Sequence, residues 1–170
     1  MSPLSVKLLA TILLGAFLLS SPCISDAASA MVDIEKILIE SNAAHQGREH
    51  IKAVRERLEQ GYADLAKALT KVPEQQRQKE MQEAAQALNQ QLELEKRAVN
   101  QVITRMMMEE VRSFRISNKI DMVVPKQVIL DADAGIDITS QIIKAMNAKK
   151  PEFGQLPVIQ VKEPNMQKKK

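Results

Sequence analysis

The segment 131–137 is the first place where side chains could perform chemistry, because it places three aspartates within seven residues. Closely spaced carboxylates are typical of calcium loops, which require glycine at position six and glutamate at position twelve. Here glycine falls at position five, as Gly135, and position twelve is Ile142. We therefore predict that the segment binds no metal and is a loop leading into a helix.

His45 and His50 are the only two histidines and stand five residues apart. Two metal ligands on one helix are normally three or four residues apart, so that both point to the same side. We predict that these histidines are solvated residues on a helix surface.

The run Met106–Met108 permits three interpretations. Binding of a soft metal would need converging sulfur atoms, but consecutive helical residues point about 100° apart. Methionine also suits an adaptable apolar surface, which makes Met107 and Met108 candidate contacts for a flexible partner. In the third interpretation Met106 fills the contact between two helices and its neighbours pack near a short first helix.

Other catalytic patterns are lacking in the sequence. No nucleophile, histidine and acid form a recognisable set, and no glycine-rich phosphate loop exists. The carboxylates of residues 45–117 are interspersed with Lys and Arg, as on a solvated helix face with i,i+4 pairs. We predict that the chain is not an enzyme and has no catalytic residue, metal or cofactor.

The element that organises the chain is a predicted antiparallel helical hairpin over 45–117. Its apolar residues recur at spacings of three and four, and Pro73 interrupts the run once. Proline disfavours helix at Val72 and suits the first position of a new helix, which we place from Glu74 to about Ser117. The seam between the two helices is predicted to include Ile51, Leu58, Leu65, Leu88, Leu92 and Val102.

Short apolar segments flank the hairpin and predict a small β-rich association body over 28–44 and 118–148. We expect strands at 28–33, 120–124 and 127–130, and a last helix with Asp137 as its N-cap. The fold class is therefore mainly α with a small β body. Such a sheet is marginal alone, so we predict an obligate oligomer. Its interface is predicted to contain Val32, Ile120, Met122, Val124, Val128 and Leu130.

Residues 1–27 have the pattern of a secretory signal peptide, with Lys7, an apolar run and small residues before the cleavage site. Cleavage after Ala27 is preferred and cleavage after Ala30 is the alternative. Cys23 is the single cysteine, and Pro22 before it disfavours lipidation. We expect an exported, soluble periplasmic protein without cysteine chemistry.

Residues 149–170 are rich in Pro and Lys and are predicted to be a disordered tail. From Ala148 onward, six lysines stand against Glu152 and Glu163. The tail is interpreted as a solvated end, and a basic tail is also a candidate for contact with anionic lipid. No nucleic-acid partner is expected, because the net charge is mild and no reading motif is found.

The order of these segments resembles the Skp/OmpH family of periplasmic chaperones. The resemblance lies in Met31–Ile34 after a signal peptide, in Ile120–Val124, and in Asp137–Thr139 opening the last helix, and it extends to about Ala148. It implies a homotrimer whose helical arms surround a cavity and hold unfolded outer-membrane β-barrel proteins without ATP.

This chain differs from that family in its charge. Family arms tend to be strongly basic, whereas 45–117 contains thirteen Lys and Arg against eleven Asp and Glu. Client contacts are predicted away from the seam, at Lys67, Lys71, Arg77, Lys79, Met107 and Met108. The alternative function is a non-enzymatic coiled-coil adaptor of the cell envelope, tethered by the basic tail.

Overall fold

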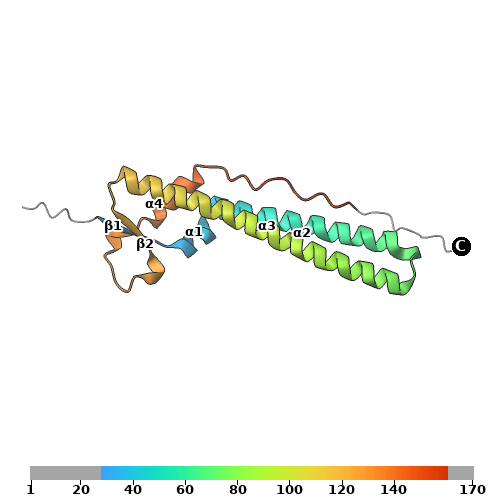
Figure 1. The fold of residues 1–170 in the computed structure, drawn as a ribbon. Helices are drawn as coiled ribbons and strands as arrows, with labels where there is room; N and C mark the ends of the chain where they lie inside the picture. The colour runs from blue at the N-terminus through green and yellow to red at the C-terminus, as the bar shows by residue number, and fades with distance from the viewer. Residues whose placement is uncertain (1–27, 161–170) are drawn as a thin grey trace, which may run out of the picture.

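The computed structural model describes residues 28–160 of the chain and shows a mainly helical protein with one small parallel sheet. The predicted signal peptide, with Cys23, and residues 161–170 lie outside the described residues. Two long helices run side by side from a smaller body at one end (Figure 1). No helix within 28–160 combines the length and the apolar character needed to cross a membrane.

The chain begins with strand β1 (Ser29–Val32) and helix α1 (Ile34–Glu40), which are separated by a capping residue. Asp33 accepts a hydrogen bond from the Lys36 amide and caps α1. Ser41 is fully buried and accepts a hydrogen bond from the Ala44 amide. Ser41 therefore both ends α1 and caps the next helix, because a side-chain oxygen at this position satisfies an amide that has no partner within the helix.

The two long helices are α2 (Asn42–Ala68) and α3 (Glu74–Ser117). A short 3₁₀ turn, η1 (Leu69–Lys71), joins them, and buried Leu69 and Val72 close the turn. The predicted limits of the second helix are those observed. Pro73 is its N-cap rather than its first helical residue, since the Pro73 carbonyl accepts the hydrogen bond from the Arg77 amide.

The sheet contains β1 and β2 (Met122–Pro125), which are parallel. Their register pairs Ser29 with Met122 and Val32 with Pro125, so the long helices form the crossover between them. The predicted strand at 127–130 is wrong. A 3₁₀ turn, η2 (Lys126–Val128), follows β2 instead, because the Gln127 side chain binds Asp33 and the Lys126 side chain binds Asp137.

Helix α4 (Thr139–Asn147) completes the body after a 3₁₀ turn, η3 (Ala134–Ile136). The helix begins two residues after the predicted N-cap, Asp137. The Asp137 carboxylate still accepts hydrogen bonds from the amide and hydroxyl of Thr139. In the core, residues of β1, α1 and α4 pack together with the C-terminal half of α3. Its buried members include Val32, Ile37, Ala43, Val99, Ile103, Met107, Ile138, Ile142 and Met146.

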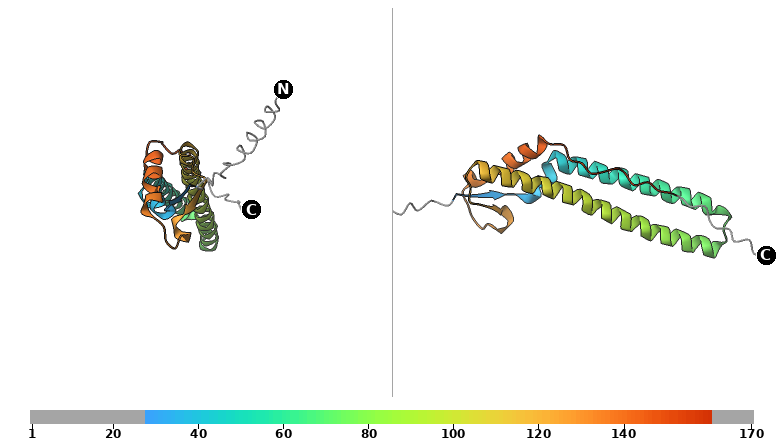
Figure 2. Two further views of the ribbon diagram at one scale, coloured as in Figure 1. Left: turned by 90° about the vertical axis from the view of Figure 1, so that its left-hand side faces the viewer. Right: turned by 45° about the horizontal axis from the view of Figure 1, so that its top comes forward.

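Residues 149–160, here called the strap, differ most from the sequence prediction. The structure has no helix or strand at 151–160, but this segment extends along α2 toward the far end of the molecule (Figures 1 and 2). Lys149 forms an ion pair with the buried Glu110. The hydrogen bond between these two side chains raises the pKa of Lys149. Pro151 is buried. For residues 149–160 the predicted disordered tail is therefore replaced by an extended segment packed on a helix.

Candidate functional site

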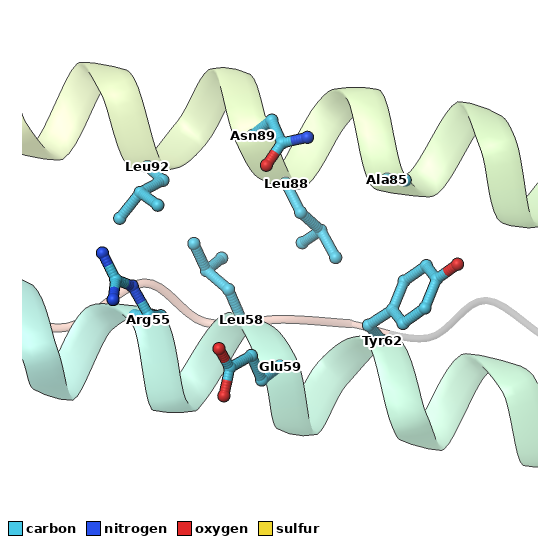
Figure 3. A pocket seen from close by; sticks show the side chains of 8 residues that line it. All are labelled: Arg55, Leu58, Glu59, Tyr62, Ala85, Leu88, Asn89 and Leu92. Carbon is cyan, nitrogen blue, oxygen red and sulfur yellow. The ribbon is translucent and has the colours of Figure 1, made fainter.

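An open groove of about 360 Å³ lies between α2 and α3 at mid-length. Leu58 and Leu88 point toward each other across it in Figure 3. Leu58 is buried, whereas Leu88 and Leu92 are only half-buried. The groove therefore offers apolar side chains at its floor with charged groups beside them. Its lining residues are Arg55, Leu58, Glu59, Tyr62, Ala85, Leu88, Asn89 and Leu92.

The groove changes the role predicted for the helix seam. The predicted client contacts lay away from the seam, whose residues were expected to pack only against the other helix. Several seam residues instead line an accessible surface. Ile51, Leu65 and Val102 are also half-buried rather than buried. The seam therefore both joins the helices and leaves apolar area open.

Near the body, the buried positions of α3 lie one residue later in the sequence than the predicted seam positions. Val102 and Met106 were expected to continue the seam, but Ile103 and Met107 are the buried residues. In this part α3 packs against α1 and α4 as well as α2, so a different face of the helix is covered. The prediction that Met107 contacts clients is therefore wrong for the single chain, because the Met107 side chain is buried. Met108, at 56% exposure, remains accessible.

A second groove of about 620 Å³ lies nearer the turn between the long helices. Ile159 and Gln160 of the strap form part of its wall, together with Glu80 and Glu83 of α3. The remaining lining residues come from the two helices and are Gly61, Tyr62, Leu65, Ala84, Ala87 and Leu88. The strap thus reaches the surface between the two long helices.

The predicted basic residues gather around the turn, but most are paired locally. The Lys67 ammonium lies 3.3 Å from Asp64, and Arg77 pairs with Glu74. Hydrogen bonds from Gln60 and then from Lys67 lower the pKa of Asp64. Exposed pairs of this kind are weak and screened by salt. These cations can exchange their partners for other anionic groups at little cost.

The two other basic residues of this group differ in their surroundings. Lys79 lies 3.9 Å from Glu83, at the limit of an ion pair. Lys71 is exposed and has no ion-pair partner among residues 28–160. Of the predicted cations at the turn, Lys71 is the one most available to an acidic group.

The body exposes apolar side chains that a single chain leaves uncovered. Leu130 is fully exposed, Val128 is 76% exposed and Met122 is 52% exposed. All three belong to the predicted oligomer interface. Its other members are covered within the chain, since Val32 is buried and Ile120 and Val124 are half-buried.

The candidate metal ligands serve structural roles. Asp133 accepts a hydrogen bond from the Gly135 amide at 2.7 Å, and Asp137 accepts one from the Thr139 amide at the start of α4, whose N-cap is Ile138. Hydrogen bonding by Thr139, assisted by Lys126, lowers the pKa of Asp137 to about 2. Within residues 28–160, no three His, Cys, Asp or Glu side chains are grouped so that they could hold a metal ion.

The two histidines differ in their surroundings. His45 is exposed and its Nδ1 lies 2.8 Å from the Arg48 guanidinium. His50, predicted to be solvated, is instead half-covered by the ring of Phe153, with 5.5 Å between ring centroids. The prediction fails at His50 because the strap lies over this part of α2.

Sequence reasoning missed Gly47 and Gly61, the two glycines of α2. The Phe153 ring reaches 3.4 Å from the position of a Cβ on Gly47, and Ile159 packs on Gly61. Glycine inside a helix costs about 1 kcal/mol relative to alanine, so its presence can indicate a close approach by another segment. That signal was available in the sequence, although the identity of the approaching segment was not.

In comparisons with known proteins, no family model matches this chain, and no curated protein matches it.

Proposed function

We propose that this chain is an ATP-independent periplasmic holdase of the Skp/OmpH type, which binds unfolded outer-membrane proteins in a cavity between the helical arms of a homotrimer. In this proposal α2 and α3 form one arm, and the body supplies the trimer contacts. The observation that carries the proposal is the long apolar groove between α2 and α3, bordered by exposed charges. It has the surface chemistry that an unfolded chain can use.

The exposed apolar residues of the body support the trimer. Leu130, Val128 and Met122 lie at the end of the molecule away from the turn, beside a sheet of only two strands. A soluble protein normally covers such residues, and a partner strand or body would also cover the open sheet edges. Three associated bodies would then hold three helical pairs close together.

Weak contacts become effective through proximity in this mechanism. Each groove offers leucine side chains and the methylene stems of Lys and Arg, which contribute little individually. Three arms around one client raise the effective concentration of these contacts. The client is held while every single contact remains reversible, so no nucleotide is needed for release.

Suppression of aggregation tests the proposed function. A chemically unfolded outer-membrane β-barrel protein is diluted from denaturant with and without the chain, and light scattering is recorded. We expect scattering to be abolished at a small molar excess of trimer. Unimpeded aggregation at several-fold excess would rule out the holdase and leave the adaptor as the remaining proposal.

The two proposed functions differ in their dependence on the basic C-terminal residues, which only the adaptor function should require. Deleting residues 161–170 removes four lysines while leaving the strap in place. The holdase predicts that aggregation is still suppressed by the shortened chain. The adaptor predicts lost attachment to anionic vesicles or envelope fractions with no change in aggregation.

A further inference from the structure

The strap meets α2 at two points that are both marked by glycine. Phe153 lies over Gly47, and the Cγ2 atom of Ile159 lies over Gly61. Gly47 also receives Val99 and Ile103 of α3, so this glycine lies where both helices and the strap meet. We call Gly47 and Gly61 the glycine notches. A side chain at Gly47 would collide with Val99 of α3 and touch Phe153, whereas a side chain at Gly61 would collide with Ile159 of the strap.

The spacing of the notches matches an extended chain. Fourteen residues separate them along α2, which corresponds to about 21 Å of helix rise and returns to within about 40° of the same face. Phe153 and Ile159 are six residues apart, which corresponds to about 20 Å in an extended chain. A strand with apolar side chains at positions i and i+6 can therefore contact α2 at Gly47 and fill the notch at Gly61 at once.

The strap is held by side chains rather than by its backbone. Among the described residues, no backbone hydrogen bond joins 151–160 to another segment. Pro157 and Ile159 are half-buried, whereas Leu156, before Pro157, and Val158, between the two, are exposed. Over residues 156–160 this alternation is that of an extended strand with one face against the helix. Such a segment opens readily, because few buried contacts hold it.

We propose that the notched face of α2 is a binding site for an extended polypeptide with apolar side chains at i and i+6, and that the strap occupies this site until an unfolded client replaces it. The identity of the client rests on the proposed holdase function. Strands of outer-membrane barrels alternate apolar and polar residues, so two residues six apart share the apolar face. An unfolded chain of this class presents the required pair repeatedly.

The first test locks the strap in place. The Cβ of Ile159 lies 3.0 Å from the Cβ position of residue 61, and a disulfide needs about 3.5–4.5 Å, so a small adjustment suffices. Gly61→Cys and Ile159→Cys are introduced into the full chain with Cys23→Ser. Because a cysteine side chain at residue 61 fills the notch that Ile159 enters, the probe for this chain carries Ala in place of Ile159. It is otherwise a fluorescein-labelled peptide with the sequence of residues 153–160, and its binding is followed by anisotropy.

We expect the oxidised double-cysteine chain to bind this peptide at least about tenfold more weakly than the reduced chain, with full recovery in dithiothreitol. The Cys23→Ser chain treated with the same oxidant is the control and should not change. Equal affinity of the oxidised and reduced forms would overturn the proposal.

The second test releases the strap and does not depend on the disulfide. Ile159→Asp changes a strap residue and leaves the helices intact, as circular dichroism should verify. The probe here is the parent peptide, with the unsubstituted sequence of residues 153–160. If the strap occupies the site in nine chains of ten, its release raises the apparent affinity for the parent peptide about tenfold. A peptide with Asp at the position of Ile159 is the matched control and should not bind. Unchanged affinity for the parent peptide would contradict the proposal.

Aggregation assays on the same locked chain separate this site from the proposed function. Weaker suppression of aggregation in the oxidised form than in the reduced form supports both. A lock that blocks the peptide but not suppression would overturn the assignment of the site to clients. Failure of every form to suppress aggregation, with peptide binding still switched by the lock, would overturn the holdase and leave the peptide site standing.

Discussion

Ile159 packs so closely on Gly61 that its Cγ2 atom lies 2.5 Å from the position that a Cβ would take on the glycine. Only hydrogen fits at residue 61 while Ile159 stays in place. Glycine at residue 61 of α2 therefore allows the strap, which is distant in sequence, to pack at this place.

Gly61→Ala should separate the stability of the helix from the docking of the strap. Alanine favours a helix interior by about 1 kcal/mol over glycine, but its methyl group displaces Ile159. We expect faster hydrogen exchange at 155–160 and no loss of protection in α2, measured by mass spectrometry. Gly61→Ala with Ile159→Ala relieves the collision and should restore much of the protection. Unchanged exchange of the strap in the single variant would show that it does not dock on Gly61.

Ile142→Ala should strongly destabilise the body. Ile142 is fully buried on α4 and belongs to the core shared with α1, α3 and β1. Truncating such a side chain removes apolar contact and leaves a cavity, at a cost of about 2–5 kcal/mol in the free energy of unfolding. Urea denaturation measures this change. Val158→Ala, at an exposed position of the strap, is the control and should alter stability by less than about 0.5 kcal/mol.

Asp137 should make the stability of the body depend on acid pH. Its pKa is lowered from 3.8 to about 2 in the folded chain. A lowered pKa means that the carboxylate stabilises the fold at pH values above about 4, and that this contribution disappears as the pH falls from 4 to 2. The full contribution is about 2 kcal/mol.

Asp137→Asn provides the test of that dependence. The variant should be less stable than the parent at pH 6, and the difference should shrink toward pH 2. Urea midpoints at both pH values measure it. A difference between the two proteins that stays constant with pH would assign the effect to hydrogen bonding alone.

Leu130→Glu should dissociate the proposed trimer without unfolding the chain. Leu130 is fully exposed in the single chain, so the substitution disturbs no contact within it. Buried at a trimer interface, an unpaired carboxylate would cost several kcal/mol. Native mass from light scattering should fall from trimer to monomer. Val158→Glu adds the same charge on the strap, and it should leave the mass unchanged.

Val124→Asp, at another residue of the interface predicted from the sequence, is a less selective test. Val124 is half-buried within the chain and pairs with Met31 in the sheet. An aspartate there would weaken the body itself as well as an interface. A Leu130→Glu chain that remains trimeric would contradict the interface placed on this surface.

Much of the local structure could be predicted from neighbouring residues. Pro73 sets the turn between the long helices, and the spacing of apolar residues predicts α3 from Glu74 to Ser117. Asp137 was predicted as the N-cap of the last helix, but the N-cap is Ile138, and Asp137 instead accepts a hydrogen bond from the Thr139 amide. Caps, prolines and periodicity act within a few residues, so a single sequence expresses them directly.

The strand at 127–130 could not be excluded in this way. Its β-branched residues favour an extended chain, yet Lys126 and Gln127 are drawn to Asp137 and Asp33 of other segments. Strand formation depends on a partner strand and on the surrounding packing more than on intrinsic preference.

The sequence by itself determined the two long helices, their turn and the mixture of apolar and charged residues along them. Only the tertiary structure decided that the seam leaves an open groove, that Met107 is buried, and that the strap covers the notched face of α2. The physical reason is that helices and caps arise from contacts a few residues apart. The covering of a helix face depends instead on segments that are far apart in the chain, and composition alone does not specify which of them meet.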